Sequence, residues 1–114
     1  DGARGHNFLL SALLAFAVEL PAYWVLKNSF KRERPRNMPV FITPSDRYSL
    51  PSGHTAAAFL MAETVAVFYP MMLWFAFIWA GLIGASRLLL GVHYLTDLFA
   101  GAGLGLLAAW CVLP

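Results

Sequence analysis

The sequence predicts an all-α membrane protein: a transmembrane helical bundle of about four helices, with its site residues gathered at one membrane face. Hydrophobic residues make up 60% of the 114 residues and charged residues only 12%, whereas soluble domains are nearer half apolar and a quarter charged. A soluble domain of this size has too little interior for so many apolar side chains. Long apolar segments also recur along the chain, which favours a bilayer as the solvent.

Four apolar segments account for most of the chain. The first is long enough to cross a hydrocarbon core of ~30 Å as a helix, and the second is short and is expected to extend back through His54. None has a clean polar stripe, which is typical of helices that are apolar nearly all round. The segments run from about Phe8 to Leu26, Thr55 to Tyr69, Met71 to Leu90 and Tyr94 to Leu113.

The connections between these segments divide the polar residues unevenly. Pro70 predicts a tight, uncharged turn after the second segment, whereas the long polar stretch 27–53 contains several helix-breaking prolines: Pro35, Pro39, Pro44 and Pro51. Alternating crossings then bring that stretch to the same face as the end of the third segment and the start of the fourth. The residues expected at this face are Lys27, Arg34, Ser52, His54, Arg87, His93 and Asp97.

His93 and Asp97 have the spacing of a nucleophile and the group that orients it. Residues i and i+4 lie on one face of a helix, so the carboxylate can accept a hydrogen bond from one ring nitrogen. The other nitrogen is then free to attack. A helix-terminal capping pair has the same spacing and is equally compatible with these residues alone.

Ser52, Gly53 and His54 open the second segment. Amide groups at a helix start bind anions, and a glycine lets a phosphate approach closely. His54 could protonate a leaving oxygen because its ordinary pKa is near neutrality. The alternative is that Ser52 is a simple N-cap and His54 an interfacial residue.

Basic residues concentrate at the same face. Lys27, Arg34 and Arg87 are candidates to hold phosphate oxygens, since arginine offers a planar fork and lysine a point charge. Snorkelling and contact with anionic lipid are the alternative, and this is the interpretation we prefer for Lys31, Arg32 and Arg36. Together with the two histidines, the cations favour phosphoryl transfer to His93, with His54 as general acid.

Three ordered motifs resemble the type-2 phosphatidic acid phosphatase superfamily, which includes bacterial acid phosphatases and vanadium haloperoxidases. They are Lys27-(six residues)-Arg34-Pro35, Pro51-Ser52-Gly53-His54, and Ser86-Arg87-(five residues)-His93-(three residues)-Asp97.

The resemblance implies a lipid phosphatase that needs no metal or other cofactor. It implies that His93 is the nucleophile, His54 the general acid and Asp97 the orienting group. The phosphate would be held by Lys27, Arg34, Ser52, Gly53 and Arg87.

The same resemblance implies a bacterial inner membrane with the active face toward the periplasm. Membrane members usually have six helices, so residues 1–114 are expected to be a single catalytic core that lacks two preceding helices. The expected partners are membrane lipids and a lipid phosphate or diphosphate, not nucleic acid. Undecaprenyl diphosphate, phosphatidic acid and phosphatidylglycerophosphate are the candidate substrates, and the oligomeric state is not assigned.

Three other functions are compatible with parts of the pattern. A phosphotransferase would use the same phosphohistidine with a different acceptor. A metal could be held by His54, His93 and Asp97, although the nearby cations would repel it. A non-catalytic lipid-binding module would leave the motif spacing unexplained.

Two further features lie inside the apolar segments. Glu19 and Glu63 are expected at similar depth near mid-membrane, where at least one should be protonated and bonded to a neighbouring helix or to a helix outside this sequence. Gly101 with Gly105, and Gly81 with Ala85, have the spacing of small residues that let helices pack closely.

Overall fold

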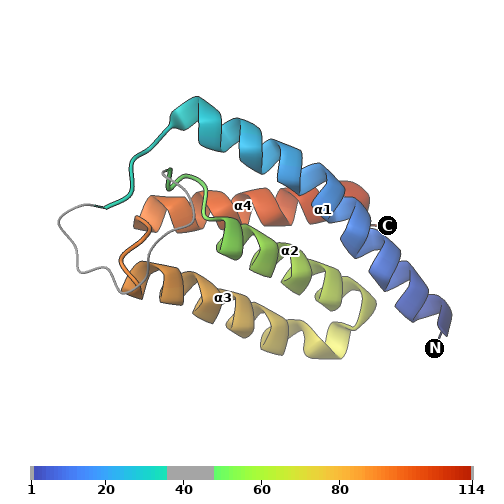
Figure 1. Cartoon of the computed structure of the whole chain (residues 1–114). Coiled ribbons are helices and arrows are strands. Elements are labelled where there is room, and N and C mark those ends of the chain that lie inside the picture. The colour runs from blue at the N-terminus through green and yellow to red at the C-terminus, as the bar shows by residue number, and fades with distance from the viewer. Residues whose placement is uncertain (1, 36–47, 114) are drawn as a thin grey trace.

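The computed structural model of the chain describes residues 2–35 and 48–113. Its helices are α1 (Gly2–Phe30), α2 (Gly53–Phe68), α3 (Leu73–Leu89) and α4 (Leu95–Val112), with the short 3-10 helix η1 (Pro70–Met72) joining α2 to α3. The only strand-like pairing among the described residues is an isolated bridge between Glu33 and Tyr48. The predicted all-α bundle is therefore confirmed (Figure 1).

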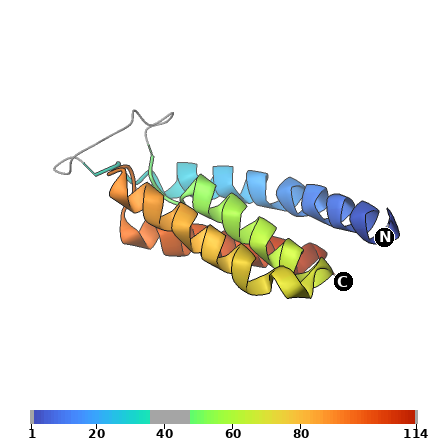
Figure 2. The same ribbon diagram turned by 90° about the horizontal axis from the view of Figure 1, so that it is seen from below.

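Helix α2 lies at the centre of the bundle. It packs against α1, α3 and α4, and α1 also packs along α4. The end of α1, the end of α3 and the starts of α2 and α4 lie together at one end of the molecule, and the chain termini lie toward the other (Figures 1 and 2). This is the arrangement that alternating crossings predict, and it gathers the polar motifs at one end.

The helix boundaries differ from the apolar segments mainly in α1. This helix begins at Gly2, continues through Pro21 and ends at Phe30, because polar residues can extend a helix beyond the hydrocarbon core. Lys31 then takes a left-handed conformation with φ 50°, and its amide donates to the carbonyl of Lys27 at 3.0 Å, a common way to end a helix. The predicted loop positions Arg36, Pro39 and Pro44 lie outside the described residues.

Close packing of α2 on α4 depends on two glycines. A Cβ atom at Gly101 would lie 2.5 Å from the carbonyl oxygen of Ser52, and one at Gly105 would overlap the carbonyl oxygen of Ala56 and lie 2.9 Å from the amide nitrogen of Leu60. These neighbours are backbone atoms and cannot rotate away. The packing role predicted for Gly101 and Gly105 is therefore confirmed.

The same prediction is wrong for Gly81 and Ala85. A Cβ atom at Gly81 would meet nothing within 4 Å among the described residues, and both positions are exposed. Helix α3 instead packs through its small buried residues Ala76, Ala80 and Gly84, which lie on a different face. Two small residues four apart do not indicate which face of the helix meets its neighbour.

The outer surfaces of the helices are apolar. Helices α1, η1 with α3, and α4 are long and apolar enough to cross a membrane, and α2 is a shorter apolar helix. Large hydrophobic side chains on these surfaces are exposed, including Leu13, Trp24, Trp74, Ile78 and Trp110. Such a surface is stable in lipid and would be costly in water.

Candidate active site

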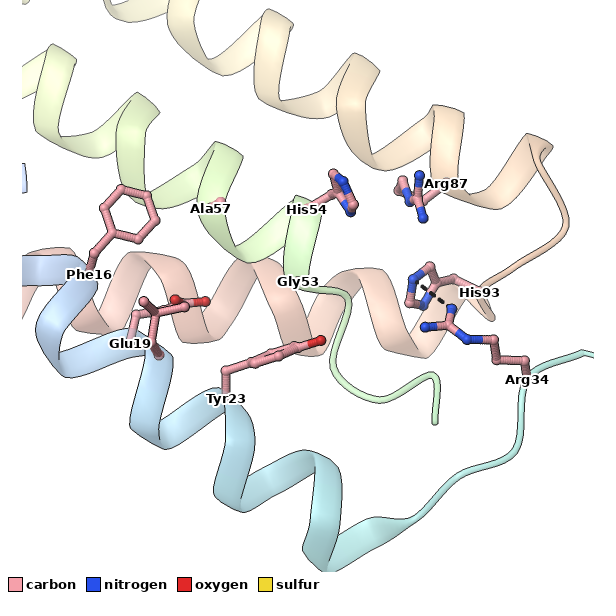
Figure 3. A pocket seen from close by; sticks show the side chains of 10 residues that line it. Phe16, Glu19, Tyr23, Arg34, Gly53, His54, Ala57, Arg87 and His93 are labelled. Atoms are coloured by element: carbon pink, nitrogen blue, oxygen red, sulfur yellow. Dashed lines mark hydrogen bonds between the residues drawn. The ribbon is translucent and has the colours of Figure 1, made fainter. Parts of the chain in front are cut away.

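A cavity of about 310 Å³ opens where the polar ends of the helices meet (Figure 3). Two arginines and two histidines give this cavity a basic character, and a single carboxyl group is also present. Its lining residues are Phe16, Glu19, Leu20, Tyr23, Arg34, Gly53, His54, Ala57, Arg87 and His93. The structure therefore brings most of the predicted site residues together, while Lys27, Ser52 and Asp97 are buried behind the lining.

Asp97 holds the position of His93 at the start of α4. The two side chains are buried, and Nδ1 of His93 lies 3.5 Å from Oδ2 of Asp97. The same Oδ2 accepts a hydrogen bond of 2.8 Å from the amide of Tyr94, the N-cap residue of α4. His93 itself precedes the helix, and its Nδ1 has no hydrogen-bond partner within the described residues. Asp97 thus belongs to the cap of α4, and its role in orienting His93 stays a prediction.

Arg34 lies on the other side of the His93 ring (Figure 3). Its Nη1 is 3.3 Å from Nε2 of His93 and donates to the carbonyl of Val92 at 2.9 Å. A guanidinium group has only donors, so Nε2 accepts and carries a lone pair. We therefore assign the ring proton to Nδ1, which faces Asp97.

Asp97 has a second neighbour, the cationic Arg32, that the sequence interpretation assigned to lipid contact. Nη1 of Arg32 lies 3.2 Å from Oδ1 of Asp97 and also donates to the Thr96 hydroxyl. The carbonyl of Arg32 accepts from the amide of Ser49 at 2.8 Å, which anchors this segment beside α4. Arg32, for which snorkelling and anionic lipid contact were the preferred interpretation, therefore also pairs with Asp97.

Lys31 and Arg36 are the other two residues for which lipid contact was the preferred interpretation. Lys31 is exposed, as expected for a lipid or solvent contact, and Arg36 lies outside the described residues. The contact between Arg32 and Asp97 joins positions 65 residues apart. No periodicity in the sequence points to a contact over that separation.

The start of α2 presents amide groups to the cavity. Ser52 is the N-cap: its Oγ accepts from the amide of Thr55 at 3.3 Å and donates to Oγ1 of Thr55 at 2.8 Å, so the N-cap interpretation is correct. The amide of Ser52 donates to the carbonyl of Asp97 at 3.0 Å, which fixes α2 against α4. The first-turn amides of Gly53 and His54 lie beyond this cap, as in helix N-termini that bind anions.

Lys27 lies behind an aromatic side chain that the sequence interpretation missed. Its Nζ is 4.5 Å from the centre of the Tyr23 ring, a cation–π distance. Tyr23 lines the cavity, and a Cβ atom at Gly53 would lie 3.1 Å from the tyrosine hydroxyl oxygen. Tyr23 precedes Lys27 by four residues on one helix face, a spacing from which its place could have been predicted.

Arg87 and His54 complete the lining. Arg87 is in the last turn of α3, and its buried Nε has no hydrogen-bond partner in the part of the chain that the structure describes. His54 is exposed in the first turn of α2. Because Arg34, Arg87 and the first-turn amides surround one space beside Nε2 of His93, the cavity is suited to an anion.

The alternative of a metal site receives no support from the ligand geometry. Within residues 2–35 and 48–113, no three side chains of histidine, cysteine, aspartate or glutamate lie close enough together to hold a metal ion. His54, His93 and Asp97 therefore do not form the three-ligand group that this alternative requires.

The fold and the site together define a helical membrane protein with a basic pocket around a histidine–aspartate pair. The family model described as "PAP2 superfamily" matches residues 7–114, and the chain belongs to this superfamily. The resemblance found in the three motifs is therefore confirmed. With three helices of membrane-spanning length and composition, the chain is an integral membrane protein.

Individual relatives are bacterial. The chain is 40% identical over 106 residues to decaprenylphosphoryl-5-phosphoribose phosphatase of Mycolicibacterium smegmatis, covering 87% of this chain and 54% of the relative. It is 36% identical over 114 residues to phosphatidylglycerophosphatase B of Bacillus subtilis, and this match covers 90% of this chain and 55% of the relative. The chain thus spans about half the length of these curated relatives.

A solved structure has the same arrangement of helices. The crystal structure of Aquifex aeolicus LpxE superimposes with a TM-score of 0.81 and is 29% identical in sequence. The match covers 90% of this chain and 65% of that structure. The bundle described above is therefore similar to the corresponding part of that protein.

Proposed function

We propose that this chain is the membrane-embedded catalytic core of a lipid phosphatase that forms a phosphohistidine at His93. The observation that carries the proposal is the position of the His93 ring between Asp97 and Arg34. This position leaves Nε2 as the unprotonated nitrogen and directs it into a basic cavity. Family membership and the names of the relatives, which are phosphatases, support the same chemistry.

The first step transfers the phosphoryl group to the ring. Arg34, Arg87 and the amides of Gly53 and His54 hold the phosphate oxygens, and Nε2 of His93 attacks phosphorus in line with the leaving oxygen. Because the Arg34 guanidinium now lies 3.3 Å from Nε2, it moves from the ring onto the phosphate oxygens as substrate binds. A P–N bond forms, the P–O ester bond breaks, and His54 protonates the alkoxide.

The second step releases inorganic phosphate. His54, now neutral, accepts a proton from water as the water oxygen attacks the phosphohistidine, and the P–N bond breaks. Asp97 stabilises the positive charge that the His93 ring carries while phosphorylated. Lys27 and Ser52 do not line the cavity. The ammonium group of Lys27, which packs on the Tyr23 ring, adds positive charge near the phosphate. Ser52, as the N-cap, fixes the first turn of α2.

The proposed substrate is a phosphate ester or diphosphate of a lipid. A site at the end of apolar helices admits a phosphate from the interface while the hydrocarbon chain stays in the bilayer. The relatives named for decaprenylphosphoryl-5-phosphoribose and phosphatidylglycerophosphate support a phosphate monoester on a polar alcohol. Isoprenoid diphosphates and phosphatidic acid are the other candidates.

Phosphate release from a panel of these lipids tests the function. In detergent micelles with EDTA, the chain is expected to release inorganic phosphate from at least one lipid at the rate seen without chelator. Activity that EDTA abolishes and a divalent metal restores would contradict the mechanism. Transfer to an added alcohol in place of hydrolysis would identify the chain as a phosphotransferase.

We also propose that the protein resides in a bacterial inner membrane, in keeping with the bacterial origin of its relatives, and that its cavity is on the periplasmic side, as the resemblance to the superfamily implies. Lys31 is exposed beside the cavity end, and Cys111 is exposed in the last turn of α4. A Lys31→Cys variant that also carries Cys111→Ser should react with a membrane-impermeant maleimide in intact spheroplasts. Labelling only after the membrane is broken would place the cavity on the cytoplasmic side.

Arg32 is expected to act on the reaction through Asp97. Arg32→Gln should lower kcat about fivefold with little change in KM, because a partly exposed ion pair contributes roughly 1 kcal/mol and Arg32 does not line the cavity. Arg32→Lys should retain part of the rate, and Lys31→Gln is the control at an exposed neighbour. A rise in KM with unchanged kcat would show instead that Arg32 binds substrate.

A further inference from the structure

Glu19 is a buried carboxyl group that the proposed mechanism does not use. Its side chain is 2% exposed, and Oε2 has no hydrogen-bond partner in the part of the chain that the structure describes. Within these residues, Oε2 of Glu19 does not make the hydrogen bond to a neighbouring helix that was expected of at least one of Glu19 and Glu63. A buried polar group without a partner is costly, above all in a membrane helix, and such a group calls for an explanation.

Glu19 is one of the residues that line the active-site cavity. Glu19 lines the same cavity as Arg34, His54 and His93, and its carboxyl group lies between Phe16 and Tyr23 in the close view (Figure 3). Glu63, the other carboxyl group in the apolar segments, lines a separate cavity with Leu106, Leu107 and Trp110. The two glutamates, which the sequence placed at similar depth, therefore have different surroundings.

The depth of Glu19 indicates which part of a substrate it would meet. Tyr23 marks the level of the proposed phosphate site because its hydroxyl lies beside Gly53. Glu19 is one turn earlier on α1, ~6 Å closer to the membrane interior at 1.5 Å per residue. A lipid whose phosphate binds at Gly53 and whose chain enters the bilayer would place the first carbons of its alcohol beside Glu19.

The chemistry of the carboxyl group then selects the ligand. Phosphate oxygens are anionic acceptors, and a carboxylate repels them. A hydroxyl group can donate to a carboxyl oxygen whether or not the carboxyl is ionised. An ammonium group would require an ionised Glu19 and would be repelled by Arg34 and Arg87 in the same cavity. The surroundings therefore favour a neutral hydroxyl donor.

We propose that Glu19 is a specificity residue that accepts a hydrogen bond from a hydroxyl group on the substrate alcohol, close to the phosphate ester. This proposal rests on the proposed function, since it requires the phosphate to bind between Gly53 and His93. It selects lipids with a sugar or polyol next to the phosphate over lipids whose phosphate is attached directly to a hydrocarbon chain.

Two matched substrates test the proposal: lysophosphatidic acid, with a hydroxyl on its middle carbon, and its 1,3-propanediol analogue, which lacks that hydroxyl. We expect kcat/KM to favour lysophosphatidic acid by about tenfold, the usual effect of a hydrogen bond to a buried polar group. Glu19→Leu should reduce this ratio to about one by slowing only the hydroxylated substrate, and Glu19→Gln should retain most of it. Glu63→Leu is the control and should leave the ratio unchanged.

Several results would overturn the proposal. An equal loss on both substrates in Glu19→Leu would show a structural role, and an unchanged ratio would show no contact with the hydroxyl. Faster turnover of an analogue with an amine in place of the hydroxyl would identify an ammonium site. Hydrolysis of other lipid phosphates but of neither matched substrate would also contradict the hydroxyl specificity, whereas no hydrolysis of any lipid would contradict the proposed function itself.

Discussion

Replacing His93 with alanine should lower phosphate release from the preferred lipid by about 10³-fold or more, the usual result of removing a nucleophile. His93 is buried, with one ring nitrogen 3.5 Å from Asp97 and the other 3.3 Å from Arg34. Both neighbours keep their other hydrogen bonds without the imidazole, so the loss should come from chemistry and not from unfolding. The measurement is the initial rate in detergent, together with the thermal midpoint of each variant.

The chain offers a control for this substitution. His6 is an exposed histidine close to the start of α1, and α1 starts at the opposite end of the bundle (Figure 1), so His6→Ala should retain the wild-type rate. If His93→Ala remained as active as His6→Ala, the assignment of the nucleophile would be wrong. If the rate and the thermal midpoint fell together, the loss would instead reflect unfolding.

Adding one methyl group at Gly105 should destabilise the fold by about 2 kcal/mol or more, because overpacking against fixed atoms forces the helices apart. The new Cβ would overlap the carbonyl oxygen of Ala56 and lie 2.9 Å from the amide nitrogen of Leu60. A 114-residue protein would then lose roughly 8 °C or more in its thermal midpoint. The site should also suffer, because Ser52 and Asp97 join the starts of α2 and α4.

Gly103 provides the matched control on the same helix. A Cβ atom there would meet no described atom within 4 Å, so Gly103→Ala should keep or slightly raise the thermal midpoint, since alanine favours helix. Equal midpoints for Gly103→Ala and Gly105→Ala would show that close packing of α2 on α4 does not depend on Gly105.

The fold could be predicted from sequence because its determinants are local. Apolar runs and prolines locate the helices, and alternating crossings then place the motifs at one end. The start of α1 at Gly2 was missed because apolar composition shows which part of a helix lies in lipid. It does not show where the helical hydrogen bonds begin. Gly81 was misassigned because spacing alone does not select the face that packs.

The site could be predicted only where the chain repeats a helical spacing or a known motif. The four-residue interval between His93 and Asp97 indicated their pairing, although the pairing turned out to involve the cap of α4. Arg32 could not be found in this way because its contact with Asp97 depends on how the segment after α1 returns to α4. The place of Glu19 in the cavity depends likewise on the packing of α1 against α2.

The most direct test of the central claim is to trap the phosphorylated enzyme. The chain would be mixed with a lipid carrying a radioactive phosphate, quenched in alkali during the first turnover and digested, and the labelled peptide identified by mass spectrometry. The account predicts an acid-labile label on His93 that is absent from His93→Ala. Label on His54 or on any other residue, or turnover with direct transfer to water and no labelled protein, would contradict it.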